Sequence, residues 1–294
     1  MPLATEVSQT TRRASVAATL AVYWHLLSLD APTVAALWCW SFGKVAHVEL
    51  PALAPWLLAV GTWLVYVADR ILDGLDSENR DRLRERHYFY LQHRTAFLVA
   101  GGVISPFFAW AVFTLLSPAV RFEDAAVFAV AALYFLLVHV HGRKAERWLP
   151  KELAVGVLFA AGTTVPVWAR ASGERLALVP VVAVFAILCW LNCVAIESWE
   201  DSTWRGATPA AHSTTIWAGK HLQTLALSTA VLSLGLAFVS MRDGTRICFF
   251  LASAMSALLL FWLARRRQYL SVMQVRISAD AALLTPLLFW ACMR

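Results

Sequence analysis

Three aspartates, Asp69, Asp73 and Asp76, close an apolar run in the first third of the chain. Their spacings of four and three residues place all three carboxylates on one face of a helix. Carboxylates at membrane depth are costly unless they line a polar cavity or hold a ligand. Because like charges stacked in this way repel, we expect a cation among them, and Mg²⁺ suits carboxylate, water and phosphate oxygens. The alternative is a solvated helix end, neutralised by Arg70 and the arginines that follow it.

A second acidic cluster closes a later apolar run and repeats this geometry. Glu197 and Asp201 are four residues apart, and Glu200 lies beside them. The alternative here is a helix terminus that enters a polar loop. Together the two clusters predict one shared site for Mg²⁺ and a phosphorylated lipid, in which charge on a diphosphate leaving group is neutralised. The predicted metal ligands are Asp69, Asp73, Asp76, Glu197 and Asp201, and all of these except Asp76 are also predicted to be catalytic.

Basic residues are expected to complete such a site. Arg82 follows the first cluster, and Arg143 and Lys144 end the fourth apolar segment on the same side of the membrane. Guanidinium and ammonium groups bind phosphate, so these three residues are the predicted diphosphate ligands. The competing explanation is that cytoplasmic loops of membrane proteins generally carry such residues.

The remaining polar residues near apolar segments give weaker indications. His25, His139 and His141 border apolar runs, but no histidine–carboxylate spacing typical of a metal site selects any of them. Asp280, at the start of the last apolar segment, has either a snorkelling role or an additional role in the site.

Composition indicates an integral membrane protein of the all-α class. The chain is 60% hydrophobic and only 15% charged, and strand-like alternation is absent. Nine apolar segments predict nine transmembrane helices. The segments cover roughly residues 31–48, 52–73, 96–116, 123–141, 152–169, 176–198, 222–241, 246–264 and 279–293.

Loop charge predicts the orientation. With the N-terminus in the cytoplasm, most of the 25 Lys and Arg residues fall in inner loops, as the positive-inside rule requires. Both acidic clusters then face the cytoplasm. Residues 1–13 are polar and lack the apolar core of a cleavable signal, and no domain boundary divides residues 1–294. Because topology explains the basic residues, the net charge of +6 does not argue for a nucleic-acid partner.

The five cysteines lie mostly within apolar segments and include no CxxC pair. Ordinary buried thiols are therefore expected, rather than a disulfide framework or a zinc site. These cysteines are Cys39, Cys189, Cys193, Cys248 and Cys292.

Four short stretches, distributed between residues 23 and 201, resemble the UbiA superfamily of intramembrane prenyltransferases. Residues 23–32 (YWHLLSLDAP) are similar to a Leu-Asp-x-Pro pattern common at the first helix of that family. Residues 68–74 (ADRILDG) resemble the latter part of its first motif, Asn-Asp-x-x-Asp-x-x-x-Asp. Residues 139–144 (HVHGRK) resemble its Tyr-Pro-x-x-Lys-Arg segment, and residues 197–201 (ESWED) its second motif, Asp-x-x-x-Asp.

The resemblance implies a nine-helix bundle in a bacterial inner membrane, with a polar cavity that faces the cytoplasm. It also implies Mg²⁺-dependent transfer of an isoprenyl group from an isoprenyl diphosphate to an aromatic or other lipophilic acceptor. Such an enzyme is a transferase of alkyl groups other than methyl. Three departures from the family pattern stand out. Val65 and Tyr66 replace the opening Asn-Asp of the first motif, Glu197 replaces Asp in the second, and His139 stands where Tyr is usual.

Three functions stay open at this point. The first is prenyl transfer, in which the allylic C–O bond ionises and an acceptor attacks the carbocation. The second is a terpene cyclase of the same superfamily, which closes the cation on itself. The third is a non-catalytic lipid-binding protein that retains the fold. The chain length of the isoprenoid, the acceptor and the oligomeric state are not given by the residues.

Overall fold

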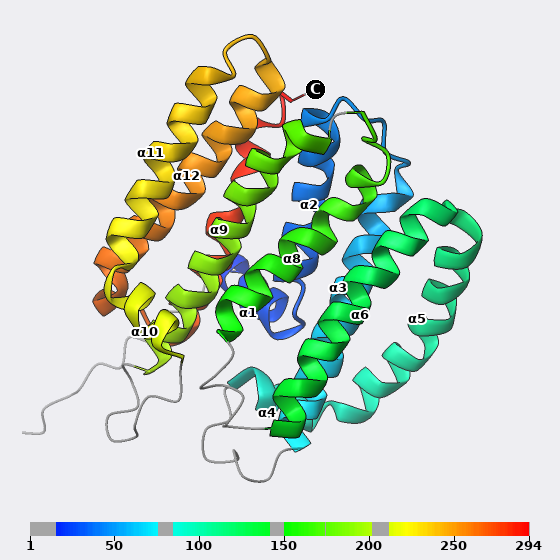
Figure 1. The fold of residues 1–294 in the computed structure, drawn as a ribbon. Coiled ribbons are helices and arrows are strands. Elements are labelled where there is room, and N and C mark those ends of the chain that lie inside the picture. The colour runs from blue at the N-terminus through cyan, green and yellow to red at the C-terminus, as the bar shows by residue number, and fades with distance from the viewer. Residues whose placement is uncertain (1–15, 76–84, 142–149, 174, 202–211, 294) are drawn as a thin grey trace, which may run out of the picture.

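The computed structural model describes residues 16–75, 85–141, 150–173, 175–201 and 212–293, and over these residues its regular elements are all helices (Figure 1). Along the chain the helices are α1 (Val16–Leu26), α2 (Asp30–Val45), α3 (Leu53–Leu75), α4 (Glu85–Gln92), α5 (Arg94–Leu115), α6 (Pro118–His141), α8 (Lys151–Trp168), α9 (Arg175–Asp201), α10 (Ser213–Lys220), α11 (Leu222–Val239), α12 (Gly244–Arg266), η2 (Arg267–Tyr269), α13 (Val272–Ala281) and η3 (Ala282–Phe289).

Each apolar segment of the sequence corresponds to a helix or, at the C-terminus, to the consecutive pair α13 and η3. Within the described residues, six helical stretches are long and apolar enough to cross a membrane, or seven if the bent pair of α1 and α2 is one span. The six stretches are Leu53–Leu72, Arg94–Leu115, Arg175–Trp199, Leu222–Val239, Gly244–Tyr269 and Val272–Phe289. The described part of the chain is therefore all-helical, and the length and composition of its helices are those of an all-α membrane protein.

The surface of α5 fits a lipid environment. Phe107, Trp110 and Phe113 are all exposed on this helix, although each is a large apolar side chain. A surface of this kind is unfavourable in water and is expected where hydrocarbon is the solvent.

Aromatic packing between α2, α9 and α12 forms the centre of the core. The Trp38 side chain is 0% exposed, stacks on Phe185 with ring centroids 4.6 Å apart, and contacts the edge of Phe249. Its indole Nε1 donates a hydrogen bond to the backbone carbonyl of Leu283 at 2.7 Å. The polar atom of this buried ring is thus satisfied by the last helical segment of the chain.

Helices α8 and α9 approach each other closely at Gly156. A Cβ atom built on this residue would lie 2.7 Å from the backbone nitrogen of Trp190 and 2.8 Å from its Cα. Only glycine permits the two backbones to approach so closely, because the atoms that a Cβ would meet belong to the main chain of α9 and cannot rotate away.

A sharp bend separates α1 from α2. The two helices meet at 89°, and Ser28 between them has a positive φ of 54°, which is uncommon for a residue other than glycine. The Tyr90 hydroxyl of α4 lies 3.2 Å from the Ser28 hydroxyl and hydrogen-bonds to it. The helix that follows the first acidic cluster thus contacts the bend directly.

The acidic helix ends lie at one end of the bundle, and the turn between α11 and α12 lies at the other (Figure 1). At this second end, Asp243 caps α12 by accepting hydrogen bonds at 3.1 Å from the backbone N–H groups of Thr245 and Arg246. The His47 Nε2 atom, from the turn between α2 and α3, lies 3.3 Å from the same carboxylate. Burial alone would raise the pKa of Asp243, but the hydrogen bonds from Thr245, Arg246 and His47 outweigh it and hold the pKa below its usual value.

Replacing Asp243 by alanine is expected to lower stability by about 1 kcal/mol at neutral pH, because the helix cap is lost. A carboxyl whose pKa is lowered on folding stabilises the protein above its unfolded-state pKa, and this contribution disappears as the pH falls through the lower folded-state pKa. The difference in apparent Tm between wild type and Asp243→Ala should therefore stay constant near neutral pH and shrink as the pH falls below about 4. Asp243→Asn is the control, since asparagine caps a helix without titrating.

Two cysteines differ from the expectation of free thiols. Cys248, near the start of α12, and Cys292, near the C-terminus, form a disulfide, whereas Cys39, Cys189 and Cys193 are free. The prediction was wrong for this pair because the spacing of the two residues, 44 positions, gives no sequence signal. Only the fold of η3 against α12 brings them together.

Candidate functional site

The first acidic cluster lies at the end of α3. Asp69 is held by Arg70, whose Nη1 lies 2.7 Å from the Asp69 Oδ2 atom. The Arg70 side chain is largely buried and sits over the ring of Tyr66, with its guanidinium carbon 5.0 Å from the ring centroid. Asp73 belongs to the same helix, but its side chain lies outside the described residues, as does Asp76 entirely.

The second acidic cluster lies at the end of α9. Glu197 is half-buried, and Asp201 is the last residue of the helix, with a side chain outside the described residues. The start of α8 lies beside this helix end and contributes a buried acid, Glu152, to which the Thr215 hydroxyl of α10 donates a hydrogen bond. Cys193 lies on α9 one turn before Glu197, and both Glu152 and Glu197 are close enough to interact with it electrostatically.

The two helix ends share one end of the bundle, next to α4 and α10 (Figure 1). Acidic residues of other helices lie near both α3 and α9. Tyr66 of α3 is within electrostatic range of Asp30 and Asp280, and Cys193 of α9 is within range of Asp280. Asp69 and Glu197 thus lie one turn beyond two residues, Tyr66 on α3 and Cys193 on α9, that share Asp280 as an electrostatic neighbour.

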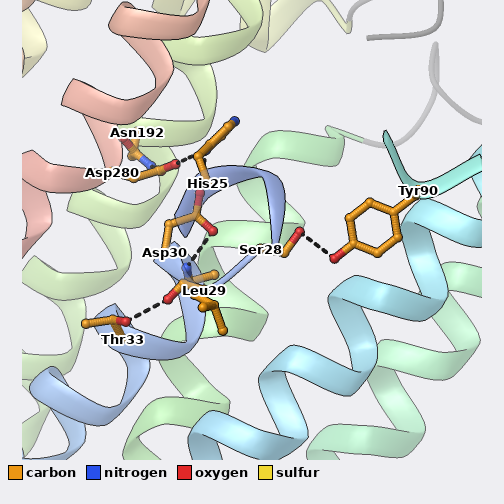
Figure 2. Close-up of polar contacts among 9 residues, drawn as sticks. His25, Ser28, Leu29, Asp30, Thr33, Tyr90, Asn192 and Asp280 are labelled. Atoms are coloured by element: carbon orange, nitrogen blue, oxygen red, sulfur yellow. Dashed lines mark hydrogen bonds and ion pairs between the residues drawn. The ribbon is translucent and has the colours of Figure 1, made fainter. Parts of the chain in front are cut away.

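A third polar cluster joins α1, α2, α9 and α13. The Nδ1 atom of His25, at the end of α1, lies 2.7 Å from the Asp30 carboxylate at the start of α2 and 3.7 Å from the Asp280 carboxylate of α13. Asn192 of α9 donates a hydrogen bond to Asp280 at 3.0 Å. Figure 2 shows these four side chains converging from four separate helices.

Sequence reasoning missed this cluster. The spacing of His25 and Asp30 matches no helical face, and the bend at Ser28 is what brings the two side chains together. Asp280 had two open roles, and its contacts with Asn192 and His25 fit the role in a site better than snorkelling. The available signal was the coincidence of three polar residues at the borders of apolar runs, together with the Leu-Asp-x-Pro stretch at residues 29–32.

The donors at the ends of α3 and α9 fit Mg²⁺ by type. Asp69 and Glu197 offer carboxylate oxygens, and the bond from Arg70 occupies only one of the two oxygens of Asp69. Mg²⁺ takes one or two protein carboxylates and completes its shell with water and substrate phosphate. The predicted diphosphate ligands Arg82, Arg143 and Lys144 lie outside the described residues.

Comparisons of the chain with family models, with curated proteins and with solved structures found no match. The resemblance to the UbiA superfamily therefore rests on the four stretches of sequence described above.

Proposed function

We propose that this protein is a membrane-embedded, Mg²⁺-dependent enzyme that transfers an isoprenyl group from an isoprenyl diphosphate to a lipophilic acceptor. The observation that carries the proposal is the placement of the two acidic helix ends, of α3 and α9, at the same end of an apolar helical bundle (Figure 1). Acidic groups so placed suit a polyanionic head held through metal ions, while the apolar interior suits a hydrocarbon chain. In this proposal nine helical segments span the membrane and a polar cavity faces the cytoplasm.

The proposed orientation keeps the N-terminus and the acidic helix ends in the cytoplasm of a bacterial cell. Inner loops carry most of the basic residues, which supports this assignment. The disulfide between Cys248 and Cys292 lies toward the other end of the bundle, where α12 begins. Disulfides persist in oxidising compartments, so its position supports an extracytoplasmic location for that end.

In the proposed reaction the allylic C–O bond breaks, the diphosphate leaves with the electron pair, and the acceptor forms a new bond to the allylic carbon and loses a proton. Asp69 and Glu197, with Asp73 and Asp201 on the same helices, would hold Mg²⁺, which neutralises the charge on the leaving diphosphate when bound. Arg70 fixes the orientation of Asp69 through the contact at 2.7 Å. Tyr66 lies against the Arg70 guanidinium, and this stacking limits the rotamers that Arg70 can adopt.

The test is a binding assay followed by product analysis on the purified chain in detergent. Farnesyl diphosphate with Mg²⁺ is expected to raise the apparent Tm, and Mg²⁺ alone or the diphosphate with a chelator is expected to raise it less. Mass spectrometry of a lipid extract incubated with labelled farnesyl and geranylgeranyl diphosphates is then expected to detect an acceptor-linked product. A released hydrocarbon or terpene alcohol would instead identify a cyclase, and stabilisation without any product would identify a lipid-binding protein. If the diphosphate with Mg²⁺ gives neither stabilisation nor a product, the proposed shared diphosphate site is overturned.

A further inference from the structure

We propose that His25, Asp30 and Asp280 bind one divalent first-row transition-metal ion, at a site separate from the proposed Mg²⁺ ligands at the ends of α3 and α9. The three side chains come from the end of α1, the start of α2 and α13, and one potential ligand atom from each lies within 4.8 Å of the others. Figure 2 shows the three side chains and the neighbouring Asn192. The inference does not depend on the proposed transferase activity.

The spacing of the potential ligand atoms fits a single ion. The His25 Nδ1 atom lies 2.7 Å from Asp30 Oδ2 and 3.7 Å from Asp280 Oδ2. Atoms bonded to one ion at about 2.1 Å are separated by about 3.0 Å in octahedral geometry and about 3.4 Å in tetrahedral geometry. The observed separations bracket these values, so small shifts of the side chains would complete the coordination.

Each carboxylate is oriented by a hydrogen bond to the oxygen that faces away from the imidazole. The backbone N–H of Ala31 donates to Asp30 Oδ1 at 3.0 Å, and the Asn192 amide donates to Asp280 Oδ1 at 3.0 Å. In both aspartates the Oδ2 atom remains directed at His25. Hydrogen bonds that hold the outer oxygen of a carboxylate in this way are typical of the second coordination sphere of a metal.

Two buried polar atoms at the cluster have no partner among the described residues. They are the Nε2 atom of His25 and the Oδ1 atom of Asn192, whose residues are only 3% and 7% exposed. Buried polar atoms are nearly always hydrogen-bonded, and unsatisfied ones often mark a site for an ion or an ordered water molecule. In the proposed site Nδ1 of His25 faces the ion, so Nε2 on the other side of the ring would be satisfied by an ordered water molecule rather than by the ion itself.

The backbone between the first two ligands is strained in a way that favours a functional role. Ser28 has a φ of 54° and is fully buried, and the 89° bend at this residue turns the end of α1 back toward the start of α2. Strained residues persist where the surrounding structure over-determines them, and they cluster at ligand sites. Tyr90 contributes to this constraint through its hydrogen bond to Ser28.

The donor set indicates the class of metal. One imidazole nitrogen with two carboxylate oxygens favours Mn²⁺, Fe²⁺, Co²⁺ or Zn²⁺, whereas Mg²⁺ and Ca²⁺ prefer oxygen donors alone. The ends of α3 and α9, with only carboxylates among their described candidate ligands, are expected to show the opposite preference. The two sites are thus distinguishable by the ion that each retains.

The test is metal binding by the full chain, purified in detergent and stripped with a chelator. Titration with Co²⁺ is expected to give one bound ion per chain with visible absorption, which Zn²⁺ abolishes and excess Mg²⁺ does not. His25→Gln and Asp280→Asn are expected to weaken Co²⁺ binding by more than about 10-fold, and Asn192→Ala by about 10-fold or more. His47→Gln is the matched control, because His47 also pairs with an aspartate, Asp243, at the opposite end of the bundle.

Variants of Asp69 distinguish Co²⁺ binding at the His25 cluster from binding at the proposed Mg²⁺ site. Asp69→Asn should retain the Co²⁺ signal, since Asp69 belongs to the proposed Mg²⁺ site. Size-exclusion profiles identify variants that fail to fold. If His25→Gln is unstable, Asn192→Ala replaces it in the test, because this variant keeps all three ligands and loses only the hydrogen bond to Asp280. The proposal is overturned if the wild-type chain binds no Co²⁺ or Zn²⁺ above the chelated background. It is also overturned if folded His25→Gln and Asp280→Asn bind the ion as tightly as His47→Gln does.

Discussion

Replacing Asp69 by asparagine is expected to reduce Mg²⁺-dependent product formation by about 100-fold or more, which is typical for loss of a group that stabilises developing charge. Asparagine keeps an oxygen that can accept the hydrogen bond from Arg70, which lies 2.7 Å from Asp69, so the buried guanidinium keeps a partner. The carboxylate charge is lost while the local packing is retained. The measurement is the rate of labelled isoprenyl transfer at saturating diphosphate across a series of Mg²⁺ concentrations.

Glu49→Gln provides the control for this variant, because Glu49 is an exposed acid in the turn between α2 and α3, at the other end of α3. Its activity is expected to match wild type. Asp69→Glu should recover part of the activity, since the charge is restored at a longer reach. Wild-type turnover in a folded Asp69→Asn protein would remove the end of α3 from the proposed site.

Replacing Gly156 by alanine is expected to destabilise the protein by about 1–3 kcal/mol, which lowers the apparent Tm by several degrees. The added Cβ would lie 2.7 Å from the Trp190 backbone nitrogen and 2.8 Å from its Cα. Main-chain atoms cannot rotate away as a flexible side chain can, so α8 and α9 must separate. Thermal unfolding in detergent at a fixed scan rate measures the effect.

Gly102→Ala is the matched control for Gly156→Ala. Gly102 lies inside α5, and a Cβ built on it meets nothing within 4 Å. Alanine has a higher helix propensity than glycine, so this variant is expected to be neutral or slightly stabilising. Equal Tm values for the two variants would contradict the close approach of α8 to α9.

The helices were predictable from sequence because a long apolar run has few alternatives to a helix in a membrane. The nine segments correspond to α2, α3, α5, α6, α8, α9, α11, α12 and the pair of α13 and η3. The length and hydropathy of each helix decide whether it can cross a membrane. Only six stretches of the described residues combine the length and hydropathy needed to cross a membrane, or seven with the bent pair.

The polar cluster at His25 was less accessible to sequence reasoning, for a physical reason. Periodicity reports which residues share a face of one helix, and His25 and Asp30 lie on two helices that meet at 89°. Asp280 joins them from a helix about 250 positions later in the chain. The same argument applies to Cys248 and Cys292, which meet only because η3 returns against α12. The acidic ends of α3 and α9 were found because their residues are neighbours in sequence.

The hydrogen bond from the Trp38 indole to the Leu283 carbonyl has a consequence for biosynthesis. The two residues are 245 positions apart, so the donor leaves the ribosome long before its acceptor has been translated. Trp40 likewise stacks on Trp290 at 3.8 Å between ring centroids. Until residues 283–290 are synthesised, α2 therefore lacks the hydrogen-bond acceptor of the Trp38 indole and the ring that stacks on Trp40. The core closes only when the final segment arrives, so premature termination before residue 283 should leave an unfinished bundle for quality-control proteases.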